Sequence, residues 1–152
     1  MKQCLIMKKC QEYNVYTFTG SGDWRFGPII QLFSPSMNPG ELIEWFSDEK
    51  TSEGNEWVSI DKERDAIALY DIGDQFEDEI ASFLIDLNTK KRFEMSRKNF
   101  AEILYQWEKL RVSRPDIILV IIHEDNHISL ETDPKIIKEY QDAGHAFDIN
   151  KQ

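Results

Sequence analysis

The sequence predicts an α+β fold, in which an antiparallel sheet carries two to three helices packed mainly on one face. Short segments rich in β-branched and aromatic residues follow one another as hairpins, and a long amphipathic helix separates two groups of them. The chain has 152 residues, of which 41% are hydrophobic, and its sequence contains neither an internal repeat nor a Pro/Gly-rich linker. We therefore expect one globular domain over residues 1–152.

The first third of the chain mixes strand and turn signals. Residues 13–19 alternate aromatic and polar side chains, which is typical of a strand. The turn residues 20–23 follow, and the apolar run 29–33 is predicted to return as the second arm of a hairpin or wide loop. A short helix is expected to begin near Pro39, and the polar residues 51–55 are expected to form a loop.

Two hairpins are predicted in the centre of the chain. Residues 57–60 and 66–72 flank a charged turn, and residues 82–87 and 91–95 flank the turn Asn-Thr-Lys. Each pair joins two segments of strand-forming residues through a short polar connection, which is the sequence pattern of antiparallel strands.

The clearest element is a helix that starts after Ser96, a residue suited to the N-cap. It is expected to run for about 16 residues and to end before Pro115, because the residue before a proline avoids helical backbone angles. Apolar side chains recur along it with helical spacing and are predicted to be buried: Phe100, Ile103, Leu104, Trp107 and Leu110.

The last third of the chain repeats the strand-turn-strand pattern. Residues 116–123 are strongly β-branched and predict a buried strand, Asp125 and Asn126 predict a turn, and residues 127–131 predict its partner strand. A last short helix is expected over residues 134–141, because a proline stands at its first position.

Negative charge is concentrated in one segment. Between Glu41 and Glu79 the chain has fourteen acidic and three basic residues, a balance of −11, against −10 for the whole protein. Such a surface repels nucleic acids and anionic membranes, and it attracts a basic partner by long-range steering. We therefore expect a basic protein partner, with no direct nucleic-acid binding and no membrane association. The basic residues 90–92, with Arg97 and Lys98, are expected to form a solvated rim or to pair with the acidic segment.

Two short stretches hold the candidate partner-binding residues. Five acids and two apolar residues occupy nine positions at the end of the predicted strand 66–72, which suits a loop that fills a basic cleft. A tryptophan and an arginine after the first turn are typical interface anchors, although Trp24 and Phe26 suit a cap on the core equally well. The candidates are Asp71, Asp74, Glu77, Asp78, Glu79, Trp24 and Arg25.

Residues 123–127 have the sequence His-Glu-Asp-Asn-His and match the H-E-x-x-H pattern of zinc proteases. That chemistry requires a helix, which places both histidines on one face to bind Zn²⁺ while the glutamate acts as general base. The preceding strand and the Asp-Asn pair favour a hairpin turn instead, with the histidines on opposite sides of it. We therefore expect no metal, no other cofactor and no catalytic residue. A zinc hydrolase that uses His123, Glu124 and His127 stays an alternative.

Cys4 and Cys10 are the two cysteines of the sequence, and the apolar stretch at the N-terminus stops at Lys8. This stretch is too short for a secretory signal, and no run approaches the roughly 20 apolar residues of a membrane span. Two reduced thiols in a cytoplasmic protein are the simplest interpretation.

Over residues 56–133, the order of elements resembles a known group of proteins. Paired hairpins lead through Phe93-Glu94-Met95-Ser96 into the helix that contains Trp107, and the run 115–120 leads into a closing hairpin. In this order and in its acidity the chain is similar to the small bacterial immunity proteins of contact-dependent growth inhibition and other polymorphic toxin systems. The resemblance implies a cytoplasmic, non-enzymatic inhibitor that binds a cognate toxin domain, often a basic nuclease, and covers its active site. An adaptor domain for another basic partner is the remaining alternative.

Overall fold

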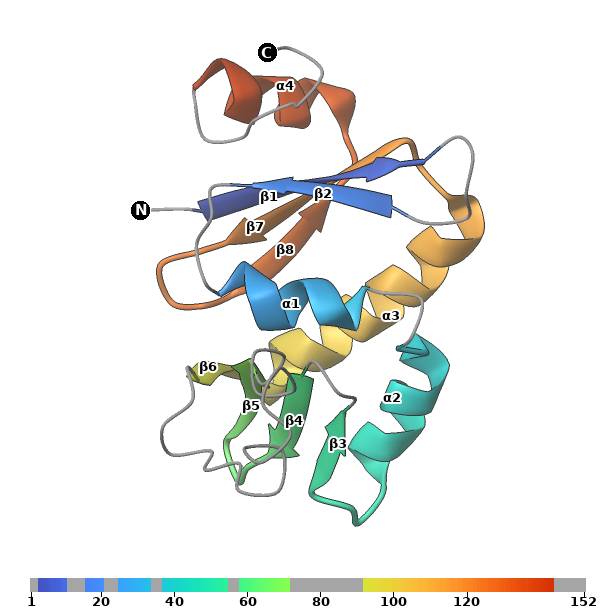
Figure 1. The fold of residues 1–152 in the computed structure, drawn as a ribbon, viewed down its shortest axis with the longest axis vertical. Coiled ribbons are helices and arrows are strands. Elements are labelled where there is room, and N and C mark those ends of the chain that lie inside the picture. The colour runs from blue at the N-terminus through green and yellow to red at the C-terminus, as the bar shows by residue number, and fades with distance from the viewer. Residues whose placement is uncertain are drawn as a thin grey trace, which may run out of the picture.

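A computed structural model describes residues 3–10, 16–20, 25–33, 37–54, 58–71 and 92–143 of the chain (Figure 1). These residues form two four-stranded antiparallel sheets, with the strand orders β2-β1-β7-β8 and β3-β4-β5-β6, together with four helices. The predicted α+β class with antiparallel pairing is therefore confirmed, with two sheets where one was expected. The elements are β1 (Gln3–Lys9), β2 (Tyr16–Gly20), α1 (Phe26–Leu32), α2 (Pro39–Ser47), β3 (Ser52–Gly54), β4 (Val58–Lys62), β5 (Ala66–Asp71), β6 (Arg92–Ser96), α3 (Arg97–Ser113), β7 (Ile117–Ile122), β8 (Ile128–Glu131) and α4 (Pro134–Asp142).

The first sheet has β1 at its centre, a strand that the sequence pattern does not predict. β1 pairs with β2 on one side and with β7 on the other, where Leu5 lies opposite Val120. Leu5 and Met7 are buried in the main core, whereas Cys4 and Ile6 are buried in a second cluster on the other face. A strand that is buried on both faces shows no polar alternation, which is why periodicity does not reveal it.

Residues 29–33, predicted as a strand, belong mainly to helix α1, so this prediction is wrong. Phe26, Ile29 and Leu32 recur every three residues, and all three are buried. Pro28 stands in the first turn of the helix, where a missing N–H costs no hydrogen bond. The helix has only seven residues, which is too short for its period to outweigh the strand-like composition.

The second sheet begins with β3, where the sequence predicts a loop. Glu53 lies opposite Ile60 of β4 in an antiparallel pair. A polar strand at the edge of a sheet has no apolar alternation, and this explains the wrong prediction. The hairpin of β4 and β5 is confirmed, with Ile60 opposite Leu69, and β6 pairs with β5 through Phe93. The predicted strand 82–87 lies outside the described residues.

The helix predicted after Ser96 is confirmed as α3. The hydroxyl of Ser96 accepts a hydrogen bond from the backbone N–H of Asn99 at 3.0 Å. Arg114 ends the helix in the left-handed conformation (φ 50°) and donates its backbone N–H to the carbonyl of Leu110 at 2.8 Å. Leu110 packs against the core but is only partly buried. The other predicted core side chains of the helix are buried: Phe100, Ile103, Leu104 and Trp107.

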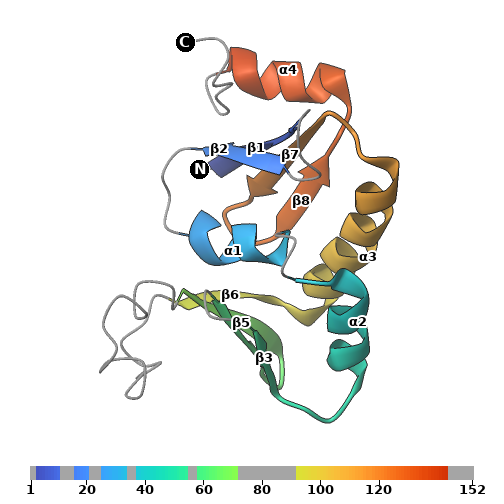
Figure 2. The same ribbon diagram turned by 45° about the vertical axis from the view of Figure 1, so that its right-hand side comes forward.

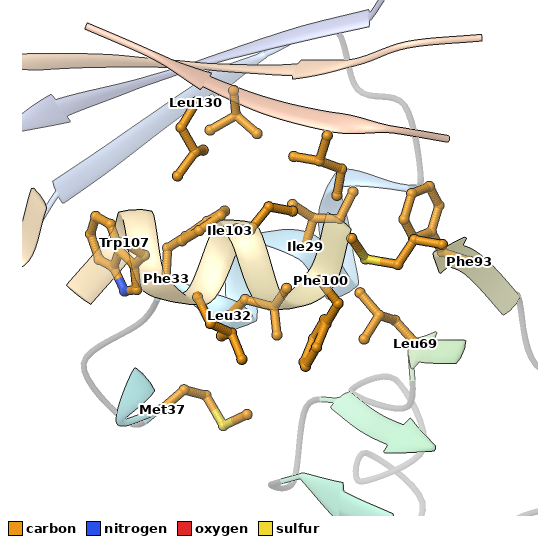
Figure 3. Packing of buried hydrophobic residues seen from close by; sticks show 14 of the residues in the cluster. Ile29, Leu32, Phe33, Met37, Leu69, Phe93, Phe100, Ile103, Trp107 and Leu130 are labelled. Atoms are coloured by element: carbon orange, nitrogen blue, oxygen red, sulfur yellow. The ribbon is translucent and has the colours of Figure 1, made fainter. Parts of the chain in front are cut away.

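One hydrophobic cluster joins the two sheets, and α1 and α3 lie between them (Figures 2 and 3). Trp107 packs edge-on against Phe33, with ring centroids 5.1 Å apart. Leu130 enters this cluster from the first sheet, and Leu69 and Phe93 enter it from the second. Both sheets therefore share the same apolar interior.

Helix α4 lies on the opposite face of the first sheet (Figure 1). Its N-cap is Asp133, whose carboxylate accepts the backbone N–H of Lys135 at 2.9 Å. Ile137 of α4 completes the second cluster, with Cys4, Ile6, Leu119 and Ile121. The first sheet thus carries helices on both faces, and packing mainly on one face is not confirmed.

Candidate functional site

Most of the predicted partner-binding residues lie outside the described residues. These are Trp24, Asp74, Glu77, Asp78 and Glu79. Asp71 is the last residue of β5 and lies opposite Val58 of β4. The acidic loop therefore stays a prediction, anchored to a defined end of the second sheet.

Arg25, the remaining predicted residue, takes part in a junction inside the molecule. It precedes α1 and donates from Nη1 to Oδ1 of Asn126 at 3.2 Å. Its neighbour Phe26 is buried in the main cluster, so the interpretation of Phe26 as a core residue is confirmed. The role of Arg25 at an interface stays a prediction.

The described part of the acidic segment presents carboxylates on α2 and β3. Glu41 and Glu44 lie three residues apart on α2, Glu49 follows the helix, and all three are exposed. Glu53 on β3 is also exposed, and its carboxylate accepts the backbone N–H of Gly54 at 3.0 Å. We call Glu41, Glu44, Glu49 and Glu53 the α2–β3 acidic surface. Glu41 and Glu44 lie on α2, Glu53 lies on β3, and Glu49 lies in the connection between these two elements (Figure 1).

The local structure holds α2 and β3 in fixed positions. Asn38 caps α2, because its side-chain oxygen accepts the N–H of Gly40 at 2.8 Å. Leu42 and Trp45 anchor the helix in the core, and the Trp45 indole donates to the Ser52 carbonyl at 3.2 Å. The acids therefore sit on a scaffold that is already organised.

Lys62 shows why this surface remains acidic. Its side chain is only 6% exposed, and its ammonium lies 4.6 Å from the ring centre of Trp45. It donates to the Trp45 carbonyl at 2.5 Å, to the Asp48 carbonyl at 2.8 Å and to the Asp48 carboxylate at 3.3 Å. A cation at a helix C-terminus is stabilising, so Lys62 closes the end of α2. Its charge is directed into the molecule and offsets Asp48, which leaves Lys50 as the exposed base among residues 41–54.

A small hollow of about 90 Å³ lies between the start of α2 and β3. Glu41 and Glu53 line it together with the apolar residues Met37 and Leu42. Gly54 lies in it with φ 152°, and a side chain there would lie 2.2 Å from the Val58 carbonyl oxygen. Carboxylates around a partly apolar hollow suit the stem and charged head of a lysine or arginine.

The basic residues near β6 pair with the acidic segment. Arg92 makes a two-pronged contact with the carboxylate of Glu63, and it also contacts Glu94 at 3.0 Å and the hydroxyl of Tyr70 at 2.6 Å. These hydrogen bonds lower the pKa of Glu63, chiefly through the guanidinium, and raise the pKa of Arg92. Arg97 donates to the Glu63 carbonyl at 3.2 Å. Charge pairing is therefore confirmed for Arg92, whereas Arg97 contacts only a backbone oxygen of the segment, and Glu63 is not part of the acidic surface.

The His-Glu-Asp-Asn-His stretch forms the predicted hairpin turn between β7 and β8. The N–H of His123 donates to the carbonyl of His127 at 2.9 Å, and the two rings lie 5.6 Å apart, centre to centre. His123 Nε2 lies 2.9 Å from the hydroxyl of Ser129. The stretch therefore lacks the helix on which the zinc-protease arrangement depends.

A shallow depression of about 630 Å³ lies beside this turn, lined by His123, Glu124, Asp125 and His127. Among the described residues, no group of three or more His, Cys, Asp or Glu side chains is placed to hold a metal ion. The two histidines are close enough to interact with each other, but they do not form the three-ligand set of a catalytic zinc site.

Asn126 is a structural residue that the sequence analysis places only in a turn. It has φ 65°, and its side-chain nitrogen donates to the Glu94 carbonyl of β6 at 3.0 Å. Its side-chain oxygen accepts from Arg25. A turn asparagine with positive φ is common, so the turn is predictable from sequence, whereas the contacts to α1 and β6 are not.

None of the described helices is both long and apolar enough to cross a membrane.

In comparisons with known proteins, no family model, curated protein or solved structure matches this chain. Function must therefore be argued from the site itself.

Proposed function

We propose that the protein is a non-enzymatic cytoplasmic inhibitor that binds a basic protein partner, of the kind formed by immunity proteins and their cognate toxin domains. One observation carries the proposal: the α2–β3 acidic surface faces solvent while Lys62, the lysine nearest to it on β4, is turned inward. A surface with this charge pattern attracts a basic partner over several ångströms and speeds its association.

The position of the predicted acidic loop supports the same partner. Gly54 of β3 lies opposite Ser59, and Asp71 of β5 lies opposite Val58. Asp71, the residue before the predicted acidic loop, therefore lies at the end of the second sheet where β3 carries the hollow. A basic nuclease domain has a cleft that binds phosphates, and carboxylates from both places would occupy positions that phosphates otherwise take.

The alternative of a zinc hydrolase receives less support from the geometry. Residues 123–127 form a turn, and Asn126 in its middle contacts α1 and β6. A general base must be held beside a bound metal and its water, and the turn offers two histidines without a third described ligand.

The test uses the reading frame beside the gene, because an immunity gene is expected to be next to its toxin gene. Expression of that neighbour should arrest growth, and co-expression with this chain should restore growth. The fourfold variant Glu41→Gln, Glu44→Gln, Glu49→Gln, Glu53→Gln should bind the neighbour's product with an association rate lowered about tenfold at low salt. The rate for the unaltered protein should also fall as salt is raised.

A matched fourfold variant provides the control. Asp116→Asn, Glu124→Gln, Glu139→Gln and Asp142→Asn remove the same charge from exposed positions before β7, in the β7–β8 turn and on α4. This control should associate at nearly the unaltered rate. Equal slowing by both variants would show a general charge effect and would remove the α2–β3 acidic surface from the interface. A neighbour that neither arrests growth nor binds would overturn the proposed function.

A further inference from the structure

The outward face of α3 carries a stripe of exposed side chains. They follow one another at spacings of four, three, four and three residues, which places them in one row along the helix. Tyr105 is 57% exposed and Val112 is 83% exposed, and these two are the exposed large hydrophobic residues of the described part of the chain. We call the row the α3 outer stripe: Lys98, Glu102, Tyr105, Lys109 and Val112.

The stripe lies on a rigid support. The opposite side of α3 is locked into the core by Phe100, Ile103, Leu104 and Trp107. The helix is also fixed at its start by the Ser96 cap. A partner that binds the stripe therefore meets a preformed surface and loses little conformational entropy in ordering it.

We propose that two copies of this chain associate through the α3 outer stripe, with the two helices antiparallel. In such a pair a twofold axis between Tyr105 and Gln106 places every residue opposite its mirror position along the helix. Glu102 and Lys109 lie about 5 Å on either side of this axis, at 1.5 Å per residue. Glu102 of each copy therefore lies opposite Lys109 of the other copy, which gives two identical ion pairs.

The apolar residues of the stripe fit the same arrangement. Tyr105 lies next to the axis and packs against its own symmetry mate. Val112 lies near the end of the helix, opposite Ala101 and the aliphatic stem of Lys98 of the second copy. Ala101 is partly buried and flanks the same side of the stripe. Charge and shape are thus self-complementary, a condition that an isologous interface must meet.

The size of the contact sets its strength. α3 has 17 residues, and one pair of such helices buries less surface than the roughly 1,200 Å² of a standard stable interface. Within one copy, Glu102 is also 4.0 Å from Lys98, and this weak pair has to reorganise. The dimer is therefore weak and forms with rising concentration.

The experiment is sedimentation equilibrium of the full chain from about 10 µM to 1 mM, which spans the range of weak association. The unaltered protein should shift from monomer toward dimer. Glu102→Lys alone and Lys109→Glu alone should each remain monomeric, because each places like charges opposite each other twice. An equimolar mixture of these two variants should dimerise, because every contact then joins opposite charges. The double variant Glu102→Lys with Lys109→Glu should dimerise as well.

The control variant is Lys135→Glu, an exposed charge reversal on α4 that should leave association unchanged. Circular dichroism should show that all variants keep the fold. A monomer at 1 mM would overturn the proposal. Association that persists in both single variants would equally overturn it, because the interface would then lie elsewhere.

Discussion

Each sheet has an edge strand, β8 or β3, whose free backbone groups are hydrogen-bonded by side chains of a helix. We call this a closure of the edge, and the two closures differ in how deeply they are buried. At β8, Asn99 of α3 accepts the Ile128 N–H at 2.7 Å and donates to the Ile128 carbonyl at 2.9 Å. Gln106 donates to the Leu130 carbonyl at 3.0 Å. Asn99 is 3% exposed, so this closure lies within the protein.

At β3 the closure lies at the surface. Trp45 of α2 donates to the Ser52 carbonyl, and Glu53 accepts the Gly54 N–H. Both devices deny a foreign strand the backbone groups of the edge. The difference is that α3 closes its edge mainly with the buried amide of Asn99, while α2 closes its edge beside exposed carboxylates. The first edge is therefore closed inside the protein, whereas the second lies beside the acids that we propose as the partner-binding surface.

The largest effect is expected from breaking the buried closure. Asn99→Ala leaves the N–H and the carbonyl of Ile128 without partners in a dry environment. We expect a loss of about 2–6 kcal/mol in the free energy of unfolding, at about 1–3 kcal/mol for each group. Urea denaturation followed by circular dichroism measures it. Gln106→Ala is the matched variant at an exposed position, and it should cost under about 1.5 kcal/mol, since water can replace the amide. Equal losses of unfolding free energy for the two variants would contradict the view that the buried Asn99 contributes more than the exposed Gln106.

An intermediate effect is expected at the end of α2, the helix that supplies Trp45 to the surface closure. Lys62→Met removes the ammonium that binds the two carbonyls at the end of α2. We expect the free energy of unfolding to fall by about 1–3 kcal/mol, because hydrogen bonds from a charged donor are lost. Lys50→Met, at an exposed lysine of the same segment, should stay within about 0.5 kcal/mol. A Lys62→Met protein as stable as the unaltered one would show that the inward lysine does not stabilise the end of α2.

The smallest effect concerns the Arg92–Glu63 pair on the second sheet. Its hydrogen bonds lower the pKa of Glu63 in the folded state below the unfolded value. The pair therefore contributes stability above the unfolded pKa, and this contribution is lost as pH falls through the folded pKa. Both side chains are about a third exposed, so screening limits the contribution to under about 1 kcal/mol.

Arg92→Gln should therefore flatten the acid side of the stability curve, measured as unfolding midpoints between about pH 2 and 6. Arg111→Gln is the control, since Arg111 lies 3.8 Å from Glu108 in an exposed pair. If the unfolding midpoints of Arg92→Gln fall with decreasing pH as steeply as those of the unaltered protein, the pH dependence would belong to other carboxylates.

The strongest local patterns predicted the fold best. α3 has a cap, a helical period and a proline after its end, and β7 is an unbroken β-branched run, so both follow from neighbouring residues alone. α1 and β3 were predicted wrongly for opposite reasons. α1 is short and apolar enough to resemble a strand, while β3 is polar and owes its conformation to pairing with β4.

The candidate site was predictable only in its charge. The excess of acids between Glu41 and Glu79 identifies the segment, but the orientation of one lysine depends on distant contacts. Lys62 of β4 contacts carbonyls at the end of α2 that are 17 and 14 residues away in the sequence, and no local pattern encodes such contacts. The bonds from Asn99 to Ile128 join residues 29 positions apart and are equally invisible to local periodicity.

Asn126 gives the β7–β8 turn an influence beyond its own surface. Through the Arg25 contact and the Glu94 carbonyl, one side chain connects the start of α1 with β6 of the other sheet. A genetic screen for loss of the proposed inhibitory function would therefore recover substitutions of Asn126 even if this residue never touches a partner. Such substitutions would resemble the loss of a catalytic residue, although their effect is to destabilise the folded protein. Second substitutions that stabilise the fold elsewhere should therefore suppress them.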